Sequence, residues 1–223
     1  MDLRKRISVK HFTDKEIPVA LIGDDRPDTG RLCCVQPNYE VIGRTLAELL
    51  MPRVGEDQAF LIMAGDSMQP SHYQIVDGFE NYLREKGSVR HLYKIQNREN
   101  KTEERYERLL RFLKNEKDIG GCFSVYARGS VLLGQALEES GRAGTLAAVG
   151  SDLFQENIDF LKRGVFTNLS IKNPYAQSYL AAKALVEYLL KGTRPASDLI
   201  NVGSEIVFQS SIPIFEKSWD SAI

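Results

Sequence analysis

The chain has 223 residues, of which 43% are hydrophobic and 26% are charged, the proportions of an ordinary globular protein. Its 29 basic and 30 acidic residues give a formal net charge of -1, which argues against a nucleic-acid footprint because phosphate binding needs a surplus of Lys and Arg on one face. No apolar run approaches the ~20 residues of a membrane span, and no signal-peptide core follows the basic start, so we expect no membrane partner.

Cysteine and histidine usage bears on location and on metal binding. The three cysteines, Cys33, Cys34 and Cys122, are odd in number and two are adjacent, which is a poor disulfide framework. This favours a reducing, cytoplasmic location, with the adjacent pair acting as buried small hydrophobic residues. The three histidines share no ligand spacing with the cysteines, so we expect neither a metal nor a cofactor.

Short aliphatic runs alternate with amphipathic segments along the chain, a pattern typical of βαβ units and a parallel sheet. In chain order, the expected elements are a strand over 17–22, a helix over 40–51, a strand over 59–64, a helix over 71–86, a strand over 89–95, a helix over 101–114, a strand over 121–125, a helix over 130–140, a strand over 146–149, a helix over 155–163, a strand over 166–171, a helix over 175–190 and late strands over 206–208 and 212–215.

Several local signals set the expected ends of these elements. Polar residues in the strand over 89–95 place it near the sheet edge, and Gly192 ends the last long helix. Asn100 and Glu103 have capping-box spacing at the start of their helix.

Polar residues follow two of the expected strands. Asp152 comes shortly after the strand over 146–149, and Lys172 and Asn173 come directly after the strand over 166–171. Ligands of α/β sheets sit at the carboxyl ends of the strands. The pattern therefore indicates one wall of a polar small-molecule cleft, and it favours binding over catalysis.

Six short motifs, each weak alone, share an order and spacing across about 200 residues with one known family. They are Ile17–Ile22, Asn38-Tyr39-Glu40 running into Gly43–Leu50, Asp77-Gly78-Phe79, Gly134 with Ala136-Leu137, Val149–Asp152 and Asn173-Pro174. By these motifs the chain resembles the effector-binding core of LacI/GalR-type transcriptional regulators, whose fold is shared with periplasmic sugar-binding proteins.

The resemblance implies an α/β fold of the periplasmic-binding-protein-like type I, with two doubly wound parallel-sheet lobes and a sugar-like effector in the cleft between them. The expected lobes are residues 1–34 plus 172–202, with the first lobe incomplete, and residues 35–171 plus 203–223. By the same resemblance the protein is a homodimer that contacts DNA only through an N-terminal helix-turn-helix absent from this chain. An incomplete sheet would leave an unpaired edge, which predicts self-association or disorder at the N-terminus.

The resemblance also implies ligand roles at the strand ends. Asp152 matches the effector-hydroxyl ligand of the family, although it could instead cap the helix that starts near residue 155. Lys172 stands where relatives often have Gln and would meet a carboxylate or phosphate, or simply be solvated. Asn173 keeps the polar residue that precedes a proline in the family pattern.

Three further candidates come from loops, and one departure bears on the ligand. Arg128 stands where many relatives carry Asn and could grip a carboxylate with both nitrogens, or be a surface residue. Ser71 matches a sugar-contacting position but is also a good helix N-cap. Asp24 lies one residue beyond the Asp of relatives, in what could be a plain Asp-rich turn. Ile75 replaces an Arg common in relatives that bind neutral sugars, so either Arg128 and Lys172 have taken over its role, which favours an acidic ligand, or the pocket does not bind an ordinary sugar.

Two other functional classes remain to be weighed. A substrate-binding protein or sensor domain for a sugar transporter or kinase is the alternative to the regulator. An enzyme is disfavoured, because the chain has no Gly-x-Gly-x-x-Gly after a strand, no phosphate-binding loop and no nucleophile elbow.

Overall fold

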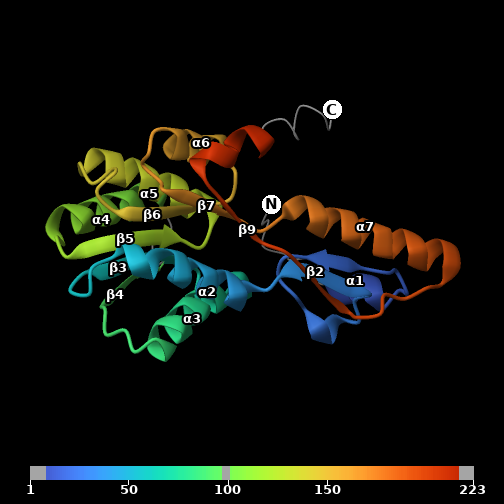
Figure 1. Cartoon of the computed structure of the whole chain (residues 1–223). Coiled ribbons are helices and arrows are strands. Elements are labelled where there is room, and N and C mark those ends of the chain that lie inside the picture. The colour runs from blue at the N-terminus through green and yellow to red at the C-terminus, as the bar shows by residue number, and fades with distance from the viewer. Residues whose placement is uncertain (1–8, 97–100, 216–223) are drawn as a thin grey trace. The chain divides into compact units, whose positions relative to one another are not determined.

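The computed structural model describes residues 9–96 and 101–215 (Figure 1). The chain divides into two compact units. Unit 1 comprises the chain up to Asn38 together with Lys172–Gly203, and unit 2 comprises Tyr39–Ile171 together with the chain from Ser204 onward. The sequence placed the first boundary at residue 34 and the last at residue 202.

Unit 2 is built on a six-stranded sheet with the order β4-β3-β5-β6-β7-β9. Its strands are β3 (Ala59–Gly65), β4 (Leu92–Gln96), β5 (Ile119–Ser124), β6 (Ala147–Ser151), β7 (Asn168–Ile171) and β9 (Glu205–Val207). All neighbours are parallel except β7 and β9, which run antiparallel. β4 lies at one end of the sheet, which confirms the edge position predicted from its polar residues.

Helices cover both faces of this sheet, because alternate side chains of a buried strand point to opposite sides. The helices are α2 (Tyr39–Leu50), α3 (Pro70–Glu85), α4 (Thr102–Asn115), α5 (Ala127–Glu139) and α6 (Gln155–Lys162). Phe60 and Ile62 of β3 pack with α2 and α3, whereas Leu61 and Met63 pack with the helices α4, α5 and α6. Figure 1 shows α2 and α3 on one side of the strands and α4 to α6 on the other.

Two glycines allow α2 and α3 to pack closely. A Cβ atom added to Gly43 would lie 2.0 Å from the Ile75 carbonyl oxygen, and one added to Gly78 would lie 2.2 Å from the Glu40 carbonyl oxygen. Any side chain at either position would therefore push the two helix backbones apart.

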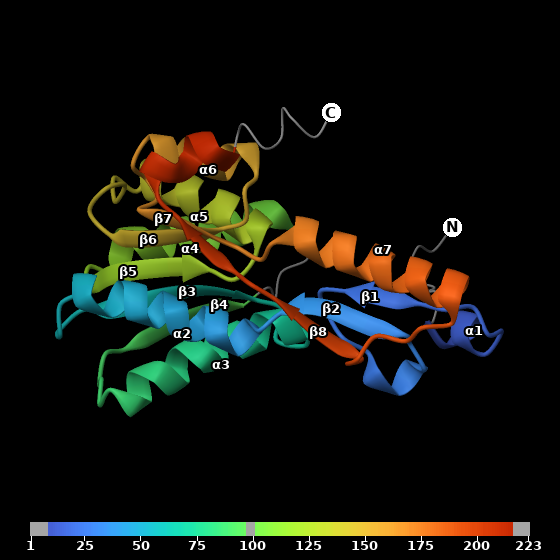
Figure 2. The same ribbon diagram turned by 45° about the vertical axis from the view of Figure 1, so that its right-hand side comes forward.

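Unit 1 is smaller and has a parallel sheet in the order β1-β2-β8. Its elements are α1 (Val9–Thr13), β1 (Ala20–Ile22), β2 (Cys33–Pro37), α7 (Pro174–Lys191) and β8 (Leu199–Val202). Figure 2 shows α7 running along these strands. The contact buries Cys33 and Val35 of β2 against Ala181 and Ala184 of α7. The sequence did not predict α1, β2 or β8, and β1 is shorter than the strand expected over 17–22.

An ion-pair network centred on the buried Arg31 joins the loop between β1 and β2 to the segment before β8. Arg31 is 6% exposed, and its guanidinium donates from Nε and Nη2 to the Asp25 carboxylate and from Nη1 to Asp198 Oδ2 at 3.0 Å. The Arg31 hydrogen bond holds the pKa of Asp25 below its ordinary value. Burial raises the pKa of Cys34 nearby to about 12, so this thiol stays neutral.

Three local predictions are wrong or fall outside the described residues. Residues 212–215, expected as a strand, are helical and follow the 3-10 turn Gln209–Ser211. The N-cap of α3 is Gln69 rather than Ser71, because the helix begins at Pro70, whose fixed φ suits the first helical position. Asn100 lies outside the described residues, and the N-cap of α4 is Lys101, which makes no side-chain capping bond.

Two further 3-10 turns are Pro27–Thr29 and Met51–Arg53. Within residues 9–96 and 101–215, no helix is both long and apolar enough to span a membrane.

Candidate functional site

The strand order of unit 2 creates a crevice at the carboxyl end of its sheet. From β3 the chain moves outward to β4 and then returns to β5 on the other side of β3. At such a switch point the two connections leave the sheet in opposite directions and open a space beyond the strand ends. The loops after β3 and β5 border this space.

A pocket of about 740 Å³ lies at this switch point. Its lining residues come from the loops after β3, β5 and β6 and from the helices α3, α4, α5 and α6: Asp66, Gln69, His72, Thr102, Arg105, Tyr126, Ala127, Arg128, Val131, Leu132, Gln135, Phe154 and Glu156. Hydroxyl, amide, carboxylate and guanidinium groups stand beside two aromatic rings. Concave surfaces with this mixture are suited to binding a polar small molecule.

His72 is fixed in the wall of the pocket by its surroundings. Its Nδ1 accepts a hydrogen bond of 3.0 Å from the Asp66 backbone N–H, so the neutral ring carries its proton on Nε2. The ring lies 5.3 Å from that of Tyr126. Gly65 leaves room for the His72 ring, since a Cβ atom at residue 65 would lie 2.5 Å from His72 Nδ1. The φ of Gly65 is +65°, a value that also favours glycine.

Two arginines give the pocket its cationic groups. Arg128 stands in the first turn of α5, and its side chain is exposed. Arg105 is half-buried on α4 and donates from Nη2 to Thr102 Oγ1 at 3.3 Å. Its Nε is buried and has no hydrogen-bond partner among the described residues. A desolvated donor of this kind favours an acceptor supplied by a ligand.

A hydrogen-bond network shapes the loop that carries Asp152. Its φ is +67°, and its backbone N–H donates to the Ser170 carbonyl at 2.8 Å. The fully buried Asn157 donates to the carbonyls of Ser151 and Asp152, and the Ser151 hydroxyl donates to Asp152 Oδ2 at 3.1 Å. Asp152 is therefore held at the end of β6, although it does not line the pocket described above.

Three of the sequence-predicted residues belong to unit 1. Asn173 is the N-cap of α7, with φ at +49° and its Oδ1 accepting from the Ala176 N–H at 3.1 Å. Lys172 is half-buried, and its carbonyl accepts from Gln177 Nε2 at 2.5 Å. Asp24 is half-buried in the bend that follows β1.

Residues of α3 that the sequence singled out lie in the core or beside the pocket. Ile75 is 1% exposed and packs in the core between α2 and α3, so it is a core residue here. Ser71 is buried in the first turn of α3, whereas His72 beside it faces the pocket. Of the predicted site residues, only Arg128 lines this pocket. No local sequence pattern marked His72 and Arg105 as site residues, because the strand order and the orientation of α3 and α4 bring them to the pocket.

Among the described residues, no three His, Cys, Asp or Glu side chains gather in a way that could hold a metal ion. All three cysteines are buried, and burial raises the pKa of Cys122 to about 12. The site's groups are donors and acceptors of hydrogen bonds.

Known proteins share this architecture. Residues 6–193 match the family whose description is "Periplasmic binding protein domain". A xylose/arabinose-binding protein, XylF of Sulfolobus acidocaldarius, is 29% identical over 106 residues, which are 45% of this chain and 26% of that protein. The chain thus matches about a quarter of this curated relative's length.

Two solved structures extend the likeness to the whole fold. GanP, a glucose-galactose binding protein from Geobacillus stearothermophilus, superposes with a TM-score of 0.80 at 21% identity, covering 92% of this chain and 72% of GanP. A putative LacI transcriptional regulator from Bacteroides fragilis superposes with a TM-score of 0.83 at 18% identity, covering 92% of this chain and 72% of the regulator. At these identities the structures establish the fold alone.

The match over residues 6–193 agrees with the parallel sheets of both units and assigns the chain to a family. This chain belongs to the periplasmic binding protein domain family, a family of binding domains rather than enzymes, and has its α/β fold.

Proposed function

We propose that this domain binds a sugar or sugar acid through the pocket of unit 2 and serves as the binding component of a sugar-uptake system. The observation that carries the proposal is the pocket itself, which gathers Arg105, Arg128 and His72 at the switch point of the sheet. The names of XylF and GanP, which describe pentose and hexose binding, support a sugar as the ligand class.

The lining of the pocket suits a polyhydroxylated ligand. Gln69 and Gln135 each offer both donors and acceptors, which match hydroxyl groups that do the same. The rings of Tyr126 and Phe154 offer apolar surface to the C–H faces of a sugar ring. Together these groups provide the mixture of polar and apolar contacts that fixes the orientation of a bound sugar.

The two arginines favour an acidic sugar. A guanidinium matches the planar geometry of a carboxylate and can donate two parallel hydrogen bonds to it. The unpartnered Nε of Arg105 supplies a donor for such a group. Asp66 and Glu156 in the same lining are acidic, so the preference for a carboxylate rests on the two guanidinium groups and not on the net charge of the pocket.

The test is calorimetric titration of the purified chain with a panel of neutral pentoses and hexoses and the matching uronic and aldonic acids. We expect the acids to bind, and Arg128→Gln and Arg105→Gln each to weaken their affinity about tenfold or more, the effect of losing a charge-assisted hydrogen bond. Arg111→Gln is the matched control, because Arg111 is exposed on α4 and does not line the pocket.

The outcomes separate the parts of the proposal. If neutral sugars bind as well as the acids, and the arginine variants bind with unchanged affinity, the preference for an acidic ligand is wrong. The proposal that the ligand is a sugar would then stand. A chain that unfolds cooperatively but binds no member of the panel would overturn the proposed function.

An effector-sensing domain of a LacI-family regulator is the second candidate, favoured by the TM-score of 0.83 to the Bacteroides fragilis structure. A cytoplasmic location, a homodimer and DNA contact through a separate helix-turn-helix belong to this candidate as predictions. Light scattering of the chain with and without its ligand tests the dimer. A monomer under both conditions, at concentrations far above micromolar, would contradict it.

A further inference from the structure

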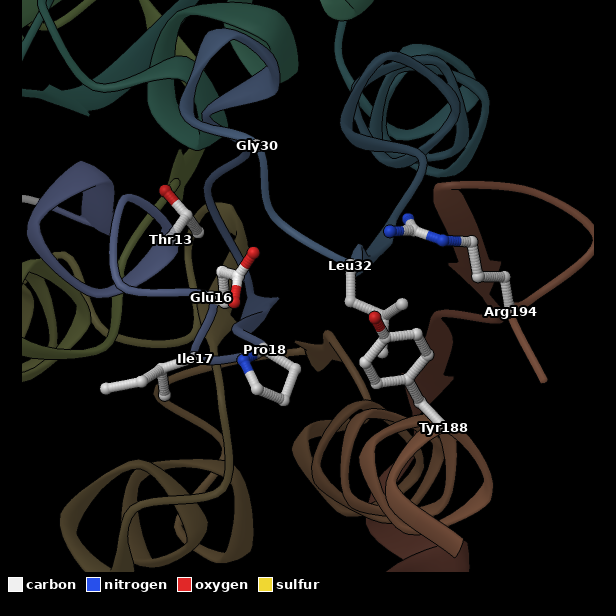
Figure 3. Close-up of a pocket in the computed structure, with 8 residues that line it drawn as sticks. All are labelled: Thr13, Glu16, Ile17, Pro18, Gly30, Leu32, Tyr188 and Arg194. Carbon is white, nitrogen blue, oxygen red and sulfur yellow. The ribbon is translucent and has the colours of Figure 1, made fainter. Parts of the chain in front are cut away.

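Unit 1 has a pocket of its own, of about 510 Å³. Ile17 and Pro18 precede β1, and Leu32 precedes β2, so the pocket lies at the amino ends of these strands. Tyr188 near the end of α7 and Arg194 just beyond it complete the opposite wall. Figure 3 shows Glu16 on one side of the space, Tyr188 and Arg194 on the other, and Leu32 between them.

Glu16 occupies a backbone position that normally takes glycine. After α1 its N–H donates to the Thr13 carbonyl at 3.0 Å, and the next N–H, of Ile17, donates to the Phe12 carbonyl at 3.1 Å. These two bonds form a Schellman motif, whose left-handed residue is usually Gly. Glu16 adopts φ of +60° there, a strained conformation for a residue with a Cβ. Backbone strain of this kind clusters at functional sites.

Arg194 is held apart from Glu16 on the far wall. Its guanidinium carbon lies 5.4 Å from the centre of the Tyr188 ring, a cation–π contact that orients the cation. Among the described residues, neither the Glu16 carboxylate nor the Arg194 guanidinium makes a hydrogen bond or an ion pair through its charged group. Opposite charges therefore stand on the two sides of one pocket without neutralising each other.

The base of the pocket is apolar. Leu32 is 5% exposed, and Pro18 is half-buried beside it. A ligand with a short hydrocarbon stem would cover this surface and remove it from water. The two ends of such a ligand would reach the charged side chains.

We propose that this pocket binds a small zwitterion, an amino acid with its ammonium group at Glu16, its carboxylate at Arg194 and its hydrocarbon stem on Leu32 and Pro18. The site is separate from the pocket of unit 2 and does not depend on the function proposed for that pocket.

The experiment titrates the ¹⁵N-labelled chain with zwitterions whose ammonium and carboxylate are separated by one to five methylene groups, from glycine to 6-aminohexanoate. Butylamine and butyrate serve as single-charge controls. We expect one chain length to bind best, with shifts confined to the amides of residues 13–17, 30–32 and 188–194. Glu16→Gln and Arg194→Gln should each weaken binding about tenfold. Asp14→Asn and Lys191→Gln, which remove neighbouring exposed charges outside the pocket, should leave it unchanged.

A further variant separates binding from folding. Glu16→Gly should relieve the backbone strain and raise the Tm by a few degrees, while weakening binding as much as Glu16→Gln does. The proposal is overturned if no member of the series binds at millimolar concentration. It is equally overturned if butylamine or butyrate binds as well as the zwitterions, or if the Glu16 and Arg194 variants bind like the wild type.

Discussion

The two units of this protein bury their sheets to very different extents. In unit 2, two large clusters of buried side chains lie on opposite faces of the sheet and include the rings of Phe60, Phe79 and Phe123. In unit 1, the cluster between α7 and the sheet comprises four small or medium residues, Cys33, Val35, Ala181 and Ala184. The apolar area buried sets most of the stability of each unit.

Unit 1 therefore depends more on polar and local interactions. The Arg31 network and the Asn173 cap join segments that its small apolar cluster holds only weakly. Exposed apolar side chains remain on α7, among them Tyr175 at 78% and Leu190 at 77%. We infer that unit 2 is the more stable part and that unit 1 opens first.

The largest expected effect comes from truncating the core of unit 2. Phe123 is fully buried and packs 4.7 Å from the Phe79 ring, so Phe123→Ala should lower the free energy of unfolding by about 3–5 kcal/mol. Val35→Ala in unit 1 should lower it by about 2 kcal/mol. In Val35→Ala, hydrogen exchange should show loss of amide protection in β1 and β2 alone. Equal loss of protection in β3 and β5 in Val35→Ala would contradict separate stabilities.

The glycine contact between α2 and α3 gives the next effect. In Gly43→Ala the new methyl group would meet backbone atoms, which cannot move aside as a side chain can, so we expect a loss of about 3 kcal/mol in urea unfolding. Gly203→Ala is the control, because a Cβ at Gly203 meets nothing within 4 Å. Similar midpoints for the two variants would show that the helices can separate freely.

The Arg31 network should make unit 1 sensitive to acid. The pKa of Asp25 lies below its ordinary value of 3.8 in the folded protein, so the folded state binds fewer protons than the unfolded chain near that pH. Its contribution is present above pH 3.8 and is lost as the pH falls through the lowered pKa.

The measurement is the stability of wild type and Asp25→Asn between pH 7 and pH 3. At pH 7 the variant should be less stable by roughly 1–3 kcal/mol, since a charge-assisted pair on a buried guanidinium is lost. The difference should shrink toward acid pH. If the difference in stability between wild type and variant is the same at pH 3 and pH 7, the effect of the substitution comes from packing and not from charge.

The smallest expected effect concerns the cap of α7. Asn173→Ala removes the acceptor for the Ala176 N–H and should destabilise unit 1 by about 1 kcal/mol. Asn173→Asp keeps an acceptor and should restore most of this stability. If both variants bind sugars with unchanged affinity, the residue acts as a cap alone.

Local patterns predicted much of unit 2, because its elements are long and periodic. The helix expected over 71–86 is found as α3, and the polar composition of residues 89–95 correctly placed β4 at the sheet edge. The prediction failed at residues 212–215, where a short apolar run is compatible with a strand or a helix turn. It also missed β8, whose half-exposed residues carry little hydrophobic signal.

The sequence by itself determined the alternation of strands and helices, and with it the parallel α/β class, because periodicity and glycine or proline ends are local properties of the chain. It also indicated that Arg128 follows a strand. Only the tertiary structure decided that Arg105, His72 and Tyr126 share a pocket, since they come from three segments joined by the order of β3, β4 and β5. It also decided how closely α2 and α3 approach each other, because that distance depends on the contacts at Gly43 and Gly78.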